Sequence, residues 1–297
     1  MSTDTLRVGL VGAGPWAHRM HAPGIAGHPR TSLAAVWARR EAAAAEVAAA
    51  HGATPTTDFD EFLGQVDAVA FAVPPAVQAP LAVRAARAGK HLVLEKPVAA
   101  DVAEAELLVD AVTKAGVASI MVFTFRYATA TRKWLDTVHA VDDWVGGEAR
   151  WFSGTLTDTK YEGSRWRHDG GALADIGPHV FDLLDGALGT VTSVEHARFT
   201  EPGLWHVMLG HDGGRLSTAT MSMHTPAQPA VTDFAVHGPA GFLPFNASGE
   251  APERYPTLLD DFVALVDTRT AEHPLDVRRG LHIQRLLGRV GDQLLGG

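Results

Sequence analysis

The sequence predicts a doubly wound parallel α/β domain followed by an α+β domain, whose predominantly antiparallel open sheet has helices on one face. Three observations predict this. Short apolar runs alternate with alanine-rich stretches up to residue 120, a glycine-rich turn follows the first apolar run, and period-two patterning appears after Phe125. We therefore expect one domain over residues 1–122 and a second over 123–297, with packing of the C-terminal helices back on the first domain as an alternative.

Continuous apolar runs in the first half predict parallel strands that are covered on both faces. They are Leu6–Val11, Leu33–Trp37, Ala68–Val73, His91–Leu94 and Ala118–Phe123. The stretches between them are rich in Ala, Leu, Glu and Arg, which favours helices. These helices are predicted at Ala17–Gly27, Arg40–His51, Ala79–Ala88 and Ala103–Ala115. Gly52, Gly89 and Gly116 stand just past three of them, where a left-handed residue commonly ends a helix.

The second half shows stretches with period-two alternation, which is typical of half-buried strands. The predicted strands are Arg150–Thr157, Val191–Phe199, Leu204–Gly210, Arg215–Met223 and Thr232–His237. Residues 211–214, His-Asp-Gly-Gly, predict a hairpin turn between two of them. The predicted helices are Thr131–Ala140, Asp175–Gly186, Leu258–Thr268 and Val277–Leu295. Pro178 is compatible with such a helix because proline is tolerated in a first turn.

The bulk composition excludes several classes of protein. A chain of 297 residues with 46% hydrophobic and 20% charged residues is typical of a globular protein with a sizeable core. The net charge of −9 argues against nucleic acid or an anionic membrane as a partner. Cysteine is absent, which excludes disulfides and thiolate chemistry. Without a signal-peptide pattern or an apolar run of roughly 18 residues, we expect a cytoplasmic protein.

The glycine-rich turn is the first functional motif. Gly12, Gly14 and Ala17 fit the dinucleotide-binding fingerprint, which allows alanine at its third position. Gly12 permits the tight turn, Gly14 leaves room for a pyrophosphate, and Ala17 lets the next helix lie close to the strand. The helix N-terminus, with Pro15 and Trp16, then offers amide donors to the phosphates. The alternative is a turn that binds nothing, but the strand before it and the helix after it favour a Rossmann dinucleotide site.

The end of the second predicted strand bears on the choice of cofactor. NAD sites usually place an acidic residue there to bind the ribose 2′-hydroxyl, and this chain has Ala38 followed by Arg39 and Arg40. Because a guanidinium suits a 2′-phosphate, NADP is favoured and NAD is the alternative. The alternative interpretation is that the two arginines only form the solvent-exposed start of a helix. Val73 and Pro74 end the next strand at the ligand-binding edge of the sheet, where they form either part of the site or only a turn.

Taken with these motifs, the sequence resembles the Gfo/Idh/MocA family, the glucose–fructose oxidoreductase and inositol dehydrogenase type. The segments that carry the resemblance are Gly12–Ala17, His21–Pro23, Ala88–His91, Glu95–Pro97, Phe125–Tyr127, Trp166–Arg167 and Gly170–Asp182. Gln78 departs from the pattern, because many members have histidine there. The resemblance implies NAD(P)-linked hydride transfer at a carbinol of a sugar, cyclitol or related polyol. It also implies a homodimer or homotetramer.

The resemblance assigns catalysis to Lys96, Asp175 and His179, and adds Glu95 and Lys96 to the residues near the cofactor. His179 would exchange the hydroxyl proton with the substrate, and Lys96 would stabilise charge on the reacting oxygen. Asp175, four residues before His179 on a predicted helix, would hold His179 or a substrate hydroxyl. Asp175 also suits a helix N-cap, and any one of 15 histidines is more often structural. Asp182 is expected to be structural.

Further residues near these motifs are candidates for the substrate pocket, because tryptophan and arginine suit the faces and hydroxyls of polyols. They are Arg126, Tyr161, Trp166 and Arg167. Ordinary packing explains them equally well. No metal site is expected, since His18 and His21 lack the spacing and the carboxylate that a zinc motif requires.

Two other functions remain open at this point. One is a lyase or glycosidase that uses the bound nucleotide only transiently, and the other is a non-catalytic nucleotide-sensing regulator. The fold alone does not separate them from a dehydrogenase. The set of Lys96, Asp175 and His179 favours an enzyme over a sensor, because a sensor needs no groups for proton transfer.

Overall fold

The computed structural model describes residues 5–157, 164–247, 249 and 251–295, and every structural statement below refers to them. The chain forms two compact units. The first unit comprises Met1–Thr124 and Glu250–His282, and the second comprises Phe125–Gly249 and Ile283–Gly297. The chain thus passes to the second unit two residues beyond the boundary drawn from the sequence. It returns to the first unit over residues 250–282, a stretch that the sequence-based division gave to the second domain.

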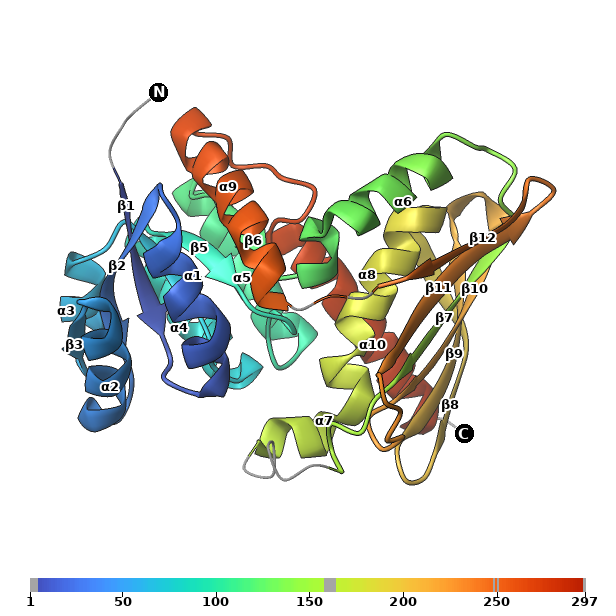
Figure 1. Ribbon diagram of the computed structural model, residues 1–297, viewed down its shortest axis with the longest axis horizontal. Coiled ribbons are helices and arrows are strands. Elements are labelled where there is room, and N and C mark those ends of the chain that lie inside the picture. Colours follow the sequence, from blue (N-terminus) through green and yellow to red (C-terminus); the bar gives the residue numbers. More distant parts are fainter. Residues whose placement is uncertain (1–4, 158–163, 248, 250, 296–297) are drawn as a thin grey trace. The chain divides into compact units, whose positions relative to one another are not determined.

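The first unit is built on a six-stranded parallel sheet with the order β3-β2-β1-β4-β5-β6 (Figure 1). Its strands are β1 (Leu6–Val11), β2 (Thr31–Trp37), β3 (Thr54–Thr56), β4 (Ala68–Phe71), β5 (His91–Leu94) and β6 (Ser119–Met121). This order reverses direction at β1, next to β4, and it is the order of the Rossmann fold. The predicted fold class of the first half is confirmed. The central strand β4 is buried along its whole length, as a strand covered on both faces should be.

Helices cover both faces of this sheet (Figure 1). They are a π-helical turn η1 (Ala17–His21), α1 (Ala22–Gly27), α2 (Glu41–His51), α3 (Phe59–Gly64), α4 (Pro75–Arg87), α5 (Val102–Ala115) and, from the later part of the chain, α9 (Ala251–Thr268). The left-handed residues after three of the helices are confirmed, with φ of 71° at Gly52, 75° at Gly89 and 65° at Gly116. The predicted helix Ala17–Gly27 begins as the π-helical turn, a feature that often occurs at functional sites.

The second unit is built on a six-stranded sheet with the order β12-β11-β7-β10-β9-β8. Its strands are β7 (Gly146–Phe152), β8 (Val191–Thr200), β9 (Leu204–His211), β10 (Leu216–Ser222), β11 (Val231–Gly238) and β12 (Gly241–Asn246). Only the central pair of β7 and β10 is parallel, so the predominantly antiparallel sheet is confirmed. Strand β12 was not predicted, because its glycine and Pro244 indicate a loop; at the edge of a sheet proline is tolerated.

The helices of this unit lie against one face of the sheet, as expected (Figure 1). They are α6 (Thr129–His139), α7 (Arg165–Asp175), α8 (Gly177–Leu188) and the part of α10 (Val277–Leu295) that follows His282. The 3-10 turn η2 (Thr124–Tyr127) begins at the last residue of the first unit, and the 3-10 turn η4 (Asp212–Gly214) joins β9 to β10. Almost every residue of α8 is buried, which makes it the core of the unit. Helix α7 was not predicted, because Gly170 and Gly171 interrupt its pattern. Strand β7 begins four residues earlier than predicted, since Gly147 is needed there for close packing against Ala235 and Leu188.

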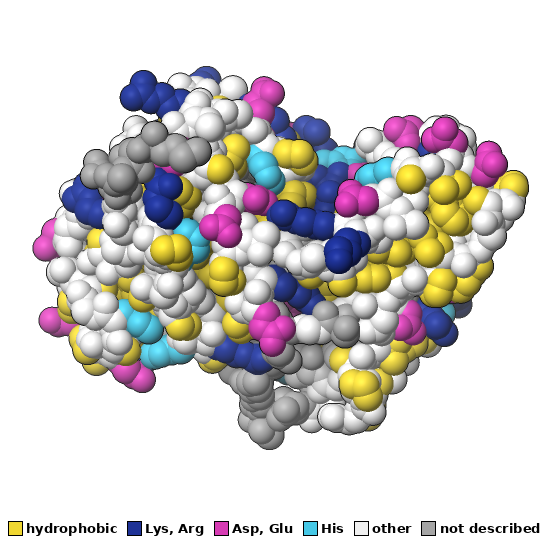
Figure 2. Space-filling view, turned by 45° about the horizontal axis from the view of Figure 1, so that its top comes forward, with side chains coloured by type: hydrophobic (Ala, Val, Ile, Leu, Met, Phe, Trp, Pro, Cys, Tyr) yellow, Lys and Arg dark blue, Asp and Glu magenta, His cyan; other side chains and the backbone are white. Residues whose placement is uncertain are grey.

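Surface properties agree with the composition. None of the helices within the described ranges is long and apolar enough to cross a membrane. Basic and acidic side chains are interspersed on the face that Figure 2 shows.

Candidate active site

The glycine turn lies where β1 ends, between the ends of β2 and β4. Gly12 has φ of 117°, and its N–H donates to the carbonyl of Trp37 at 2.9 Å. A Cβ atom at Gly12 would collide with the carbonyl oxygen of Ala72 and meet Val73 Cγ1 at 3.0 Å. Only glycine fits this position, because both its backbone conformation and its surroundings exclude a side chain. Val73 therefore packs against the turn, as its place after β4 predicts.

The next residues of the turn leave a space that a pyrophosphate can fill. A Cβ atom at Gly14 would meet no other atom of the described chain within 4 Å, so this side of the backbone is open. Ala17 is completely buried, which lets the helical segment lie close to the sheet. Pro15 is exposed and Trp16 is half-buried at the start of that segment. A closed Gly12 and an open Gly14 are what the pyrophosphate of a dinucleotide requires.

Two cationic side chains follow the end of β2. Ala38 is buried and its N–H donates to the carbonyl of Thr56 at 3.4 Å, while Arg39 and Arg40 are exposed. Arg40 is the N-cap residue of α2, and its side chain does not cap the helix. Neither guanidinium has a hydrogen-bond or ion-pair partner within the part of the chain that the structure describes. Both charges are available to an anionic ligand.

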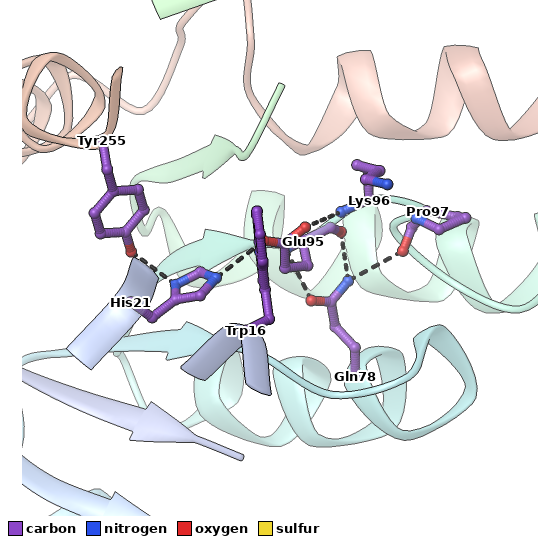
Figure 3. Close-up of polar contacts among 7 residues, drawn as sticks. All are labelled: Trp16, His21, Gln78, Glu95, Lys96, Pro97 and Tyr255. Atoms are coloured by element: carbon purple, nitrogen blue, oxygen red, sulfur yellow. Dashed lines mark hydrogen bonds and ion pairs between the residues drawn. The ribbon is translucent and has the colours of Figure 1, made fainter. Parts of the chain in front are cut away.

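The loop that carries Lys96 follows β5 and is held by one buried amide side chain, that of Gln78 in α4 (Figure 3). Gln78 Nε2 donates to the carbonyls of Glu95, Pro97 and Val98 at 2.7, 3.3 and 2.9 Å. Its Oε1 accepts the N–H of Glu95 at 2.9 Å. Gln78, the departure from the family pattern, therefore fixes the backbone on both sides of Lys96. Lys96 itself is half-buried.

The Glu95 carboxylate joins this loop to the glycine turn (Figure 3). Its Oε1 accepts Trp16 Nε1–H at 2.6 Å and lies 2.9 Å from His21 Nε2. Its Oε2 accepts the backbone N–H of Lys96 at 3.1 Å. On the other side of its ring, His21 Nδ1 lies 2.8 Å from the hydroxyl of Tyr255 in α9. The cofactor candidates Trp16 and Glu95 are thus brought together, and His21 and Tyr255 were missed.

The signal for His21 was present in the sequence, since His21–Pro23 belongs to the segments that carry the family resemblance. Nothing in the sequence indicates Tyr255, which lies 234 residues from His21 along the chain.

His179 lies in the second unit, in the first turn of α8, directly after Pro178. It is 8% exposed. Its ring stacks on Trp151 at a centroid distance of 5.8 Å and 20° between planes. The ring of Phe125 meets it edge-on at 5.3 Å and 76°. Two aromatic side chains from β7 and η2 therefore fix the plane of the imidazole, and neither contact was predicted from the sequence.

Asp175 does not share one helix with His179, in contrast to the prediction, because α7 ends at Asp175 and α8 begins two residues later. Its Oδ2 accepts Arg167 Nε at 3.1 Å. Arg167 also donates to Ser164 Oγ at 3.0 Å and lies over the ring of Trp166 at 4.5 Å. This contact with a candidate substrate residue orients the guanidinium of Arg167. The expected support of His179 or of a substrate hydroxyl by Asp175 stays a prediction.

The side chain of Arg126, a candidate for the substrate pocket, forms an ion pair with Asp182 of α8. Its Nη1 lies 3.2 Å from Asp182 Oδ1, and the Asp182 side chain is almost completely buried. A Cβ atom at Gly186 would meet the same guanidinium, so Arg126 packs closely against α8. This supports the structural role expected of Asp182. Tyr161, the remaining candidate for the substrate pocket, lies outside the described residues.

Comparison with known proteins identifies the family. The family model described as the oxidoreductase family with an NAD-binding Rossmann fold matches residues 6–124, and the GFO/IDH/MocA C-terminal domain matches residues 135–243. The chain belongs to the Gfo/Idh/MocA family. The resemblance noted from the sequence is thereby confirmed. The matched domains contain the glycine turn and the Lys96 loop in one case and His179 in the other.

Relatives in this family include sugar-nucleotide reductases. The dTDP-3,4-didehydro-2,6-dideoxy-alpha-D-glucose 3-reductase of Streptomyces antibioticus is 32% identical over 270 residues, which cover 86% of this chain and 80% of that protein. The enzyme of the same name from Streptomyces violaceoruber is 32% identical over 201 residues, or 65% of this chain and 57% of that protein. Against several curated relatives, the match spans little more than half of their length, 54% to 57%.

Among solved structures, the WlbA dehydrogenase from Bordetella pertussis, in complex with NADH and UDP-GlcNAcA, has a TM-score of 0.88 at 25% identity. The match covers 99% of this Gfo/Idh/MocA chain and 97% of that one. The fold of a Rossmann domain followed by a mostly antiparallel sheet is therefore shared over 99% of this chain.

Proposed function

We propose that this chain is an NAD(P)-dependent oxidoreductase that transfers a hydride between nicotinamide and a carbinol or carbonyl of a sugar, cyclitol or related polyol. The observation that carries the proposal is the contact between Trp16 and Glu95, which joins the glycine turn to the Lys96 loop. Both segments leave the carboxyl edge of a parallel sheet, where folds of this kind bind ligands. Relatives named as reductases of deoxysugar nucleotides support the substrate class.

The residues of the glycine turn fit the cofactor. Gly12, Gly14 and Ala17 would hold its pyrophosphate, with Val73 and Pro74 beside them after β4. When bound, the nicotinamide supplies the acceptor or donor of the hydride. In our proposal Arg39 and Arg40 give a preference for NADP over NAD, since both are exposed cations at the end of β2.

The chain itself supplies a proton acceptor and a stabilising charge. His179 would take the proton of the substrate hydroxyl during oxidation and return it during reduction. Lys96 would donate a hydrogen bond to the reacting oxygen and stabilise the negative charge that develops there. Asp175 would hold His179 or a substrate hydroxyl, and it also orients the guanidinium of Arg167, which would bind substrate hydroxyl groups. Trp151 and Phe125 hold the His179 ring in one plane, so its proton transfer has a fixed direction.

Net hydride transfer is favoured over transient redox in a lyase or glycosidase, because the relatives quoted above are named reductases. A pure nucleotide sensor would not require the proton-transfer set. The proposal includes a cytoplasmic homodimer or homotetramer, and light scattering after gel filtration measures the subunit number.

The experiment is mass analysis of nucleotide retained by the purified chain, followed by absorbance of reduced nicotinamide across a panel of sugars, cyclitols and nucleotide sugars with NADP and NAD. We expect bound nucleotide and net change in the reduced band with at least one compound. A product formed without any net change would replace this proposal with transient redox. Nucleotide binding without turnover of any compound would favour the sensor.

A further inference from the structure

A buried chain of hydrogen bonds runs from α9 to the loop that carries Lys96. It consists of Tyr255, His21, Glu95 and Trp16, which we call the Glu95 network (Figure 3). We propose that His21, Trp16 and Tyr255 are positioning residues, which fix the Glu95 carboxylate and through it set the place of Lys96 against the glycine turn. This inference rests on the proposed oxidoreductase function and adds to it a set of residues that do not contact the reacting atoms.

The direction of each hydrogen bond follows from the surroundings of the groups. Tyr255 is completely buried, and burial, with the Glu95 charge as a smaller cause, raises the pKa of its phenol well above 10. The hydroxyl therefore keeps its proton and can donate to His21 Nδ1. When Nδ1 accepts this hydrogen bond, the ring hydrogen lies on Nε2, from which it donates to Glu95. The phenol thus selects the tautomer that Glu95 requires.

Glu95 connects two segments that must be correctly placed for catalysis. Its Oε1 accepts from Trp16 and His21 in the helical segment after the glycine turn, whereas its Oε2 accepts from the backbone of Lys96. In each of these three hydrogen bonds an N–H group donates to the carboxylate, so the group acts as an acceptor on both oxygens. A glutamine would present an amide NH₂ to one of these donors. The network therefore requires a carboxylate and not only a polar side chain of this size.

The packing of α9 on α1 is shaped to admit Tyr255. A Cβ atom at Gly24 would collide with the Tyr255 ring. The absence of a side chain at this position of α1 therefore leaves room for the phenol. The rings of His21 and Tyr255 meet edge-on, with centroids 5.1 Å apart. His21 itself is fully buried, at the end of the π-helical turn. The phenol and the imidazole are therefore held by packing as well as by their hydrogen bond.

The network is expected to act on one half of the dinucleotide. In a Rossmann site the adenosine ribose lies at the end of the second strand, and the nicotinamide lies on the other side of the glycine turn. Glu95 follows β5, on that other side. Disturbing the network should therefore lower the catalytic rate and the affinity for the nicotinamide half of the dinucleotide. Binding of the adenosine half should be retained.

The experiment compares His21→Leu, Glu95→Gln and Tyr255→Phe with matched controls. His28→Leu removes another buried histidine that pairs with α9, through Asp260 at 3.1 Å. Thr31→Val removes another buried hydroxyl, which donates to the carbonyl of Ile25. Each protein is measured for its melting temperature, for kcat and KM, and for affinity toward ADP-ribose and its 2′-phosphate, which carry only the adenosine half.

We expect His21→Leu and Glu95→Gln to lower kcat by about 10- to 100-fold, because small displacements of a catalytic group are costly. Affinity for the adenosine-half probes should stay within about twofold, as for distant independent sites. Tyr255→Phe should lower kcat less, by about threefold to tenfold, because His21 keeps its bond to Glu95. The two controls should retain kcat even where their melting temperatures fall.

Two outcomes would overturn the inference alone. In the first, the unmutated chain turns over normally, but the His21→Leu and His28→Leu proteins lose activity in equal proportion to their stability. In the second, kcat is unchanged in all three network variants. A wild-type chain that neither binds nucleotide nor turns over would instead overturn the proposed function, and this inference with it.

Discussion

Arg167 Nε and Asp175 Oδ2 lie 3.1 Å apart within α7, and both side chains are largely buried. Asp175 follows Arg167 by eight positions, and Gly171 between them leaves the helical conformation with φ of 54°. A residue expected to bind substrate is therefore paired with one expected to support the catalytic histidine. The contact couples the positions of these two candidate side chains.

Breaking this pair should destabilise the second unit. Arg167→Ala leaves a mostly buried Asp175 without its guanidinium, and we expect a loss of about 1–3 kcal/mol in the free energy of unfolding. Urea unfolding at neutral pH measures it, with Arg167→Lys as the variant that keeps the charge. The double variant Arg167→Ala, Asp175→Asn should cost less than the sum of the single changes. Strict additivity would show that the two side chains are not coupled.

The two glycines of the turn should respond differently to alanine. Gly12→Ala forces a side chain into a φ of 117° and against Ala72, so it should lower stability by about 1–3 kcal/mol and abolish nucleotide binding. The methyl group that Gly14→Ala introduces meets no atom of the described chain, so stability should be retained. The same methyl group would occupy the space of the pyrophosphate, so affinity for the dinucleotide should fall. Thermal melting and calorimetric titration separate the two effects. Unchanged nucleotide affinity in Gly14→Ala would contradict the placement of the pyrophosphate.

Arg39→Ala tests the cofactor preference. Loss of one charged hydrogen bond to a 2′-phosphate should weaken NADPH binding by about 10- to 100-fold and leave NADH binding nearly unchanged. Arg87→Ala removes another exposed arginine, at the far end of α4, and should affect neither cofactor. Fluorescence titration with both cofactors measures the ratio. An equal loss for NADPH and NADH would remove the argument for a phosphate preference.

His211 should make the second unit less stable in acid. Burial is the main reason why the pKa of its imidazole is lowered from 6.5. Nδ1 lies 2.8 Å from the Gly189 carbonyl and Nε2 lies 2.7 Å from the Ser217 hydroxyl, an arrangement that suits the neutral ring. Below pH 6.5 the unfolded chain takes up a proton before the folded one does, so stability should fall as the pH is lowered through that range.

Urea unfolding at several pH values, on the wild type and on His211→Gln, isolates this contribution. The variant should show a shallower loss of stability below neutral pH. His237→Gln, which replaces an exposed histidine in β11, should keep the slope of the wild type. A slope that is the same in all three proteins would show that His211 does not titrate as described.

Elements with a strong local signal could be predicted from the sequence. Strands β1 and β5 and helix α10 have the predicted bounds, because uninterrupted apolar runs and amphipathic periodicity need no tertiary information. Elements with a weak local signal could not. Strand β3 has three residues, one of them Pro55, and α7 contains two adjacent glycines. In these cases tertiary contacts override local propensity.

The candidate site likewise contains residues that could be predicted from the sequence and contacts that could not. The residue types of the glycine turn and of the Lys96 loop follow from motifs, and the structure places Gly12 in the conformation that only glycine tolerates. The partners of those residues could not be predicted. Trp16 and Glu95 are 79 positions apart in the sequence, and Asp175 accepts a hydrogen bond from Arg167 within a helix that the sequence did not predict. Such pairs arise from packing, which leaves no periodic pattern in a single sequence.

The most direct test of the account is the turnover of Lys96→Ala at saturating cofactor, followed by the absorbance of reduced nicotinamide. We expect kcat to fall by about 100- to 1,000-fold, as for loss of one group that stabilises developing charge, with cofactor affinity within about twofold. Lys114→Ala, an exposed lysine on α5, is the matched control and should turn over normally. Normal turnover by Lys96→Ala at saturating cofactor, with or without weakened binding, would contradict the role of Lys96 at the reacting oxygen.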